Sequence, residues 1–116
     1  MDDDLETLDW AHPEFRLHIP KDPSAHRDAY IAASNRLIAL YQEYGTQLEI
    51  EKRTRNDTID AEFAQNATAR WTDVERVASW ASREAAYQSL LLNHRIKALE
   101  LYRDSLAFLI EHAPRP

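Results

Sequence analysis

The chain has 116 residues, which suits one domain and leaves little room for a second. Lys and Arg total 14 against 20 for Asp and Glu, a formal net charge of -6, and the 44% hydrophobic content is too high for a wholly disordered chain. The absence of Cys excludes disulfides, thiolate metal sites and Cys nucleophiles, and the single Gly excludes a collagen-like chain.

The first 22 residues differ in composition from the rest and form what we call the acidic arm. Residues 1–22 hold seven acidic and two basic residues, whereas residues 23–116 hold 13 acidic and 12 basic ones, so most of the net charge lies in the arm. We interpret the arm either as an irregular segment packed on a helical body or as a segment that becomes ordered on a partner. In the second case Trp10 and Phe15 would dock, and the carboxylates would face a basic surface.

The start of the chain also bears on its location. Residues 1–4 (MDDD) are the opposite of the basic region of a signal peptide. No stretch approaches the roughly 18 apolar residues that a membrane span needs. We therefore expect a cytoplasmic protein that does not associate with membranes.

The first predicted helix covers about residues 23–69. The Asp22 side chain can cap its free N–H groups, and Pro23 suits the first helical position. Apolar residues then recur at steps of three and four, as on one face of a helix. They are Tyr30, Ala33, Leu37, Leu40 or Tyr41, Tyr44 and Leu48.

Residues 49–60 (EIEKRTRNDTID) are almost wholly polar and are compatible with two structures. The first helix can continue through them, supported by charge pairs at the i, i+4 spacing such as Glu51 with Arg55. Alternatively, Asn56 and Asp57 form a turn and a short middle helix follows. We favour the continuous helix because the stretch contains neither Gly nor Pro.

The second predicted helix covers about residues 73–112 and ends before Pro114. Residues 72–75 (TDVE) match a capping box, in which the Thr72 hydroxyl and the Glu75 carboxylate each accept a hydrogen bond from the other residue's N–H. The apolar side of this helix is predicted from its spacing. Its members are Val77, Trp80 or Ala81, Tyr87, Leu91, Ala98, Leu101 or Tyr102, Phe108 and Leu109.

A short connection between these helices makes them antiparallel neighbours. The predicted fold is therefore all-α, a long, coiled-coil-like helical hairpin over residues 23–113. The second helix carries more apolar residues than one strip can hold, and large exposed apolar patches are uncommon on monomers. We therefore predict a homo-oligomer, at least a dimer, in which two hairpins form a four-helix bundle.

The sequence contains no recognisable catalytic or metal-binding pattern. Its five His residues are isolated, and neither Glu-x-x-His nor His-Glu-x-x-His occurs. Nucleophile elbows and phosphate-binding loops need Gly, and the only one is Gly45. We predict a protein that is not an enzyme and that holds neither a cofactor nor a metal.

Two basic clusters raise the alternative of nucleic-acid binding. One consists of Lys52, Arg53 and Arg55, and the other lies at residues 94–97. Neighbouring acids offset the first cluster, and an acidic protein has no general attraction for phosphate. We favour a solvated, salt-bridged face and keep the first cluster as the alternative contact to DNA or RNA.

Three aromatic residues of the second helix are predicted to contact another protein, namely Trp71, Trp80 and Tyr87. Trp71 stands before the predicted cap and has two interpretations. It can pack back on the second helix near Arg76 or Val77 as a hydrophobic staple. Otherwise it is an anchor at the tip of the hairpin.

The segments 71–76 (WTDVER), 82–87 (SREAAY) and 95–106 (RIKALELYRDSL) resemble small helical-hairpin proteins of tailed phages, often encoded near replication and recombination genes. The likeness covers residues 30–112 and leaves out the arm. It implies a phage-encoded accessory protein in the bacterial host cytoplasm, and it implies no particular activity.

The chain is also similar in length and acidity to WXG-type secreted helical hairpins. Residues 71–73 (WTD) have Asp where that family has Gly, and Tyr102 is followed four residues later by Leu106 instead of an acid. This family is therefore kept as a second, weaker resemblance.

The function predicted from the sequence is that of an oligomeric protein-interaction or accessory protein. The acidic arm also supports the hypothesis of an inhibitor or adaptor that engages a host protein through the arm. The basic cluster at residues 52–55 supports the hypothesis of a DNA- or RNA-binding accessory of recombination or replication.

Overall fold

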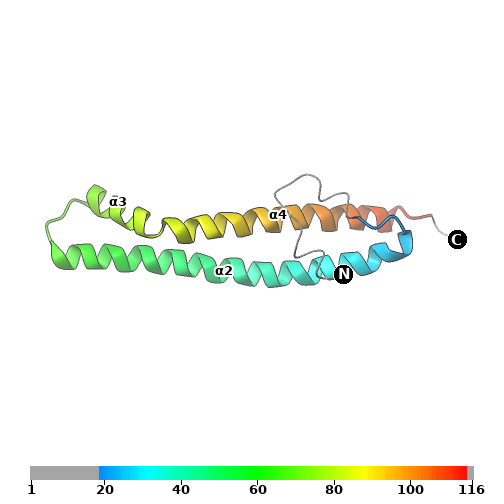
Figure 1. Ribbon diagram of the computed structural model, residues 1–116, viewed down its shortest axis with the longest axis horizontal. Helices are drawn as coiled ribbons and strands as arrows, with labels where there is room; N and C mark the ends of the chain where they lie inside the picture. Colours follow the sequence, from blue (N-terminus) through cyan, green and yellow to red (C-terminus); the bar gives the residue numbers. More distant parts are fainter. Residues whose placement is uncertain (1–18, 115–116) are drawn as a thin grey trace. The chain divides into compact units, whose positions relative to one another are not determined.

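A computed structural model describes residues 19–114 of the chain. This part consists of a short 3-10 turn, Pro23–Ala25, followed by the helices α2 (His26–Gln65), α3 (Trp71–Ala81) and α4 (Arg83–Glu111) (Figure 1). No strand occurs within it, so the predicted all-α class is confirmed. None of these described helices combines the length and the apolar character that a membrane span requires. The predicted partner-binding residues Trp10 and Phe15 lie outside the described residues.

The chain enters its first helix as the sequence predicts. The carboxylate of Asp22 accepts a hydrogen bond of 3.0 Å from the N–H of Ser24, and Pro23 follows the cap. The backbone and side-chain hydrogen bonds from Ser24 lower the pKa of Asp22. His26 then begins α2 and is buried, and its ring Nε2 donates to the carbonyl of Pro20 over 2.6 Å.

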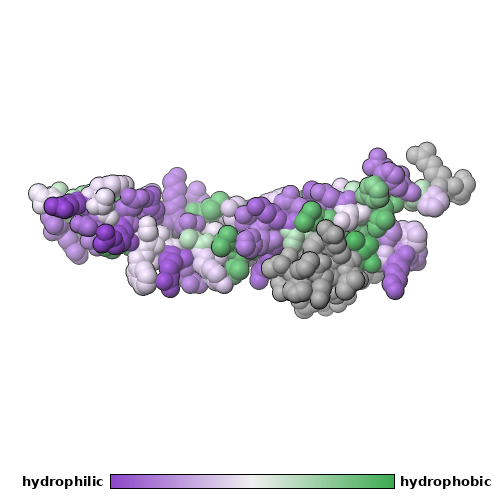
Figure 2. All heavy atoms as spheres, turned by 90° about the horizontal axis from the view of Figure 1, so that it is seen from above, coloured by the Kyte–Doolittle hydropathy of each residue, from purple (hydrophilic) through white to green (hydrophobic). Residues whose placement is uncertain are grey.

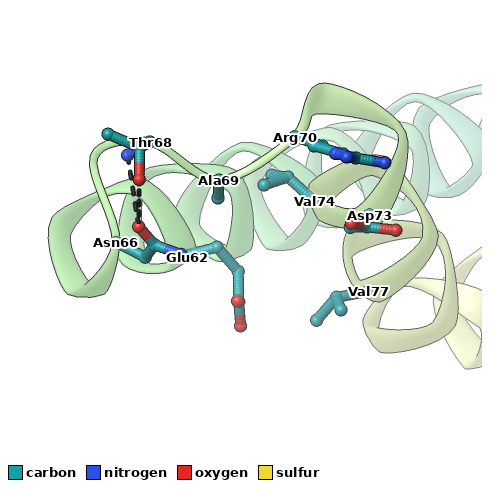
Figure 3. A pocket seen from close by; sticks show the side chains of 8 residues that line it. All are labelled: Glu62, Asn66, Thr68, Ala69, Arg70, Asp73, Val74 and Val77. Atoms are coloured by element: carbon teal, nitrogen blue, oxygen red, sulfur yellow. Dashed lines mark hydrogen bonds between the residues drawn. The ribbon is translucent and has the colours of Figure 1, made fainter.

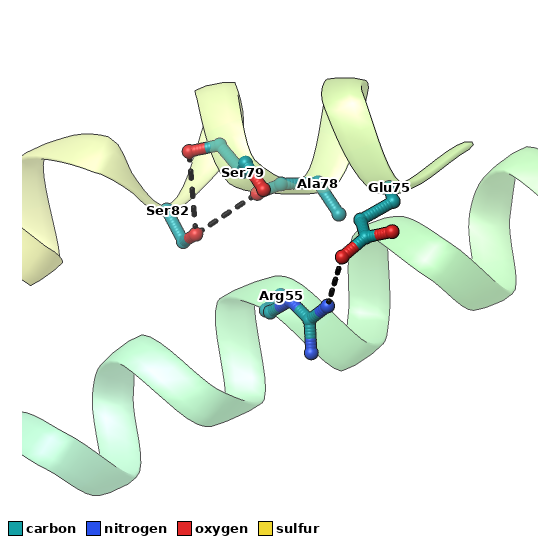
Figure 4. A network of polar contacts seen from close by, with 5 residues as sticks. All are labelled: Arg55, Glu75, Ala78, Ser79 and Ser82. Carbon is teal, nitrogen blue, oxygen red and sulfur yellow. Dashed lines mark hydrogen bonds and ion pairs between the residues drawn. The ribbon is translucent and has the colours of Figure 1, made fainter. Parts of the chain in front are cut away.

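Helix α2 is continuous through the polar stretch at residues 49–60, as the absence of Gly and Pro predicts. The charge pair that supports it differs from the predicted one. Arg55 forms an ion pair of 3.5 Å with Glu75 of α3, and not with Glu51 of its own helix (Figure 4). The stretch is polar because its side chains face water or a charged group on the neighbouring helix.

The chain forms two compact units. The first contains residues 19–42 and 92–114 of the described part, so the early turns of α2 pack against the later turns of α4, which runs the opposite way. Most of the buried hydrophobic residues lie here. They are Ala33, Leu37, Leu40, Leu92, Ile96, Ala98, Leu99, Tyr102 and Leu106. This unit has an ordinary helical core.

The second unit, Glu43–Leu91, contains the end of α2, all of α3 and the start of α4. Its buried hydrophobic residues are Val74 and Ala78 alone, and no residue of α2 in this unit is buried. Ser82 and Ser89 complete its buried row. Because burial of large apolar side chains is the main source of stability, this unit has little internal support.

The predicted capping box is wrong. Helix α3 begins at Trp71, and its N-cap is Arg70, which has extended backbone angles and makes no side-chain cap. Thr72 therefore lies inside the first helical turn, where its hydroxyl is not placed to cap. The turn is stabilised earlier, because the side-chain oxygen of Asn66 accepts hydrogen bonds from the N–H (3.2 Å) and the hydroxyl (3.0 Å) of Thr68.

The second predicted helix is divided at Ser82, a break that was not predicted from the sequence. This residue has φ -93° and ψ 4°, and its hydroxyl donates to the carbonyl of Ala78 over 2.9 Å (Figure 4). A buried Ser that bonds back in this way bends a helix. The buried row nevertheless continues through Val74, Ala78, Ser82 and Ser89, so α4 keeps the rotational phase of α3.

The predicted apolar side of the second helix is only partly right. Ala98 and Tyr102 are buried and Leu91 is half-buried, but the remaining positions are exposed, namely Val77, Trp80, Ala81, Tyr87, Phe108 and Leu109. The helix has two apolar faces, and in the second unit the buried face uses small residues, which let two backbones approach closely. Hydrophobic residues consequently appear at the surface among charged ones (Figure 2).

Candidate protein-interaction surface

The exposed side of α3 and of the first turns of α4 carries a row of six residues that we call the aromatic face. Its members are Val77, Trp80, Arg83, Glu84, Tyr87 and Leu90, and all of them are exposed. Their spacing of three or four residues, across the Arg83–Glu84 pair, places them on one side of a helix. The buried row lies on the opposite side of the same helices.

Trp80 is the most prominent residue of the aromatic face. It is 70% exposed, more than any other large hydrophobic residue among those described. The guanidinium carbon of Arg83 lies 4.5 Å from the centre of its ring, which is a cation–π contact. Trp and Arg are among the residue types that are enriched at the binding hot spots of protein interfaces.

The two charged residues at the centre of the aromatic face have no ion-pair partner in the described part of the chain. Ion pairs there join Arg55 to Glu75 and Arg103 to Asp104. The carboxylate of Glu84 accepts a hydrogen bond of 3.0 Å from the side chain of Gln88, which leaves its charge uncompensated. Both charges can therefore bind groups of a partner.

Trp71 lies apart from the aromatic face. It is nine residues before Trp80, or about two and a half helical turns, so the two side chains point to opposite sides. The ring of Trp71 stacks on Phe63 of α2, with centroids 6.3 Å apart and an interplanar angle of 12°. This contact replaces the predicted staple on its own helix. The contact of Trp71 with Phe63 was not predicted from the sequence, because the residues around Phe63 show no apolar spacing of three and four.

An open depression of about 320 Å³ lies where α2 ends and α3 begins (Figure 3). It is lined by Glu62, Asn66, Thr68, Ala69, Arg70, Asp73, Val74 and Val77. The only hydroxyl in this lining, that of Thr68, donates to the side-chain oxygen of Asn66, which is not a base. The lining thus offers no activated nucleophile, and we assign no chemistry to it.

The described His residues have structural contacts or lie alone. Within residues 19–114, no three His, Asp or Glu side chains gather in a way that would hold a metal ion. His112 donates from Nδ1 to the carbonyl of Phe108 over 2.9 Å, and the two rings stack. His94 is exposed on α4.

The basic cluster proposed for nucleic acid is only partly available. Lys52 and Arg53 are exposed on α2. Arg55 is already paired with Glu75, so the cluster does not present three free cations. Nucleic-acid contact at these residues stays a prediction.

No protein-family model, curated protein or solved structure matches the chain. The two family resemblances in the sequence therefore stay predictions.

Proposed function

We propose that this protein is not an enzyme and acts by binding protein surfaces, beginning with a second copy of itself, through the aromatic face. The observation that carries the proposal is the contrast within the second unit. This unit buries only Val74 and Ala78 as hydrophobic residues, while Trp80 and Tyr87 remain exposed. A partner that covers the aromatic face would supply the apolar burial that the unit lacks.

The aromatic face also suggests how two copies assemble. It lies on the side of α3 and α4 that is opposite to their buried row, and this row packs towards α2. Within the second unit, we therefore place α3 and the start of α4 of two copies at the centre of a four-helix arrangement, with the end of α2 of each copy outside. The resemblance of segments 71–76 and 82–87 to phage hairpin proteins is kept as the proposed origin.

The test is the association state of the full chain, measured by sedimentation equilibrium from about 1 to 200 μM. We expect a dimer, and we expect Trp80→Ala to raise the dissociation constant at least about tenfold, since interface Trp residues are typical hot spots. Leu48→Ala is the matched control, because Leu48 is an exposed aliphatic residue of α2 in the same unit. It should leave the dissociation constant unchanged. A wild-type chain that is monomeric at 200 μM would contradict the proposal.

A further inference from the structure

The charged residues of the aromatic face are separated by sign on either side of its two rings. Trp80 and Tyr87 are seven residues apart, close to two helical turns, and define a line along the helix that we call the seam. Successive helical residues are rotated by about 100°. Arg83 therefore lies about 50° to one side of the seam, and Glu84 lies about 50° to the other.

The preceding helical turn repeats this order. Arg76 lies about 30° from the seam on the side of Arg83, and Asp73 lies about 30° from it on the side of Glu84. We call Arg76 and Arg83 the basic edge, and Asp73 and Glu84 the acidic edge. All four residues are exposed. The buried row keeps its rotational phase across Ser82, so both edges run from α3 into α4.

The two edges hold every charge of this stretch that is not already compensated. The only other charged residue between Trp71 and Leu91 is Glu75, which pairs with Arg55 of α2. Within residues 19–114, no ion pair involves a residue of either edge. A partner that covers the seam must therefore meet a row of positive charge on one side and a row of negative charge on the other.

The direction of the helices decides which edges meet when two copies pair through the seam. A two-fold axis parallel to the helices sets the basic edge of each copy beside the acidic edge of the other. A two-fold axis perpendicular to the helices keeps each edge on its own side. In every antiparallel register, like edges would therefore face each other, which is unfavourable at an interface.

We propose that the occupant of the aromatic face is a second copy of this chain, bound parallel and in register, with the two-fold axis along the seam. The proposal rests on the self-association put forward above and specifies its geometry. Trp80 and Tyr87 each meet the same residue of the other copy. Arg83 of one copy lies beside Glu84 of the other, with a difference in height of only about 1.5 Å.

The other two edge residues form a second pair of the same kind. Arg76 lies three residues after Asp73, and helical side chains lean towards the N-terminus, so the guanidinium of Arg76 extends to the level of Asp73 in the other copy. The symmetry forms each pair twice. The parallel register thus covers the seam and gives every edge charge a neighbour of opposite sign.

A charge exchange tests the pairing of the edges. Arg83→Glu sets carboxylates against each other on both sides of the seam, and Glu84→Arg does the same with guanidinium groups. Each variant should therefore raise the dimer dissociation constant about tenfold. The double variant R83E/E84R restores opposite charges and should return to within about threefold of the wild type, the remainder being the lost cation–π contact with Trp80.

Two matched controls make the same changes of charge outside the edges. Lys52→Glu and Asp57→Arg change exposed residues of α2 in the same unit and should leave the dissociation constant unchanged. An antiparallel dimer would respond little to either single exchange, because like charges would still face each other. If the two single effects simply add in the double variant, Arg83 and Glu84 do not meet across the interface.

Distances between the copies test the direction, because the natural chain contains no Cys and one introduced Cys can carry a spin label. Thr72→Cys, Ser79→Cys and Gln88→Cys change exposed residues outside the seam. In the parallel dimer, pulsed electron paramagnetic resonance should give label-to-label distances that agree within about 6 Å, because the copies stay level along the helix. In an antiparallel dimer, the three distances would differ by more than about 10 Å wherever the axis lies.

The outcomes separate this inference from the proposed function. A monomeric wild-type chain contradicts self-association itself and leaves the aromatic face to a different protein. A dimer with equal label distances and rescue by the double variant supports the parallel register. A dimer with unequal distances, or one that neither single exchange weakens, overturns the register and leaves self-association standing.

Discussion

Tyr102 shows how burial changes the chemistry of a single residue in this protein. It is 3% exposed in the core of the first unit, and burial raises the pKa of its hydroxyl because water no longer solvates the phenolate. The next residue, Arg103, meets two opposing influences. Desolvation lowers its pKa, but a hydrogen bond from its side chain to Asp104 and the nearby negative charge raise it by more, so the net shift is upward.

The raised pKa of Tyr102 predicts a loss of stability in alkali. Because the folded state holds the phenolic proton more tightly than the unfolded state does, its contribution is fully present below about pH 10, the pKa of a free Tyr, and is lost as the pH rises through the higher folded-state pKa. Urea unfolding of the wild type should therefore weaken more steeply between about pH 10 and 11.5 than unfolding of Tyr102→Phe. The remaining Tyr residues are common to both proteins and serve as the internal control. Parallel pH profiles would contradict the prediction.

At the level of the helices, the sequence predicts that helices form better than it predicts where each helix begins and ends. The chain has only one Gly and no Pro inside the predicted helices, and this composition was enough to predict few, long helices. The start of α3 was misplaced because a capping box depends on local backbone angles, and Arg70 adopts the cap conformation instead of Thr72. The division at Ser82 was missed because a Ser in a helical sequence is ordinary. It bends the helix only when its hydroxyl is buried against the preceding turn.

The bend at Ser82 yields a prediction for α3 and α4. Ser82→Ala removes the hydroxyl bond to Ala78, whose carbonyl still accepts from the backbone N–H of residue 82 over 3.0 Å. The variant should therefore leave no buried group unsatisfied and raise the free energy of unfolding by about 1 kcal/mol. Ser79→Ala, an exposed position of α3, should raise it by only about 0.5 kcal/mol, which is the gain in helix propensity alone. Chemical denaturation measures both values, and destabilisation by Ser82→Ala would show that the hydroxyl has a net stabilising role.

For the molecule as a whole, the candidate surface could be predicted only in part. Trp80 and Tyr87 were predicted to contact another protein from their residue type, before their exposure was known. Which apolar face of the second helix is exposed was not predicted, because the helix has two such faces and periodicity alone does not say which one is buried. That choice depends on the close approach allowed by Ala78 and Ser82, a property of the packed pair of helices. The cation–π contact with Arg83 depends on the same choice.

The unequal burial in the two units predicts that thermal stability depends on protein concentration. If covering the aromatic face completes the second unit, the folded dimer is favoured by mass action, and a hundredfold rise in concentration adds about 2.7 kcal/mol per dimer. For two chains of this length, the melting temperature should rise by about 5 °C between 2 and 200 μM. Circular dichroism can measure this shift directly. Trp80→Ala should melt at a temperature that changes little with concentration, whereas Leu48→Ala should behave like the wild type. A wild-type melting temperature independent of concentration would mean that the second unit stays folded without a partner, even though Val74 and Ala78 are its only buried hydrophobic residues.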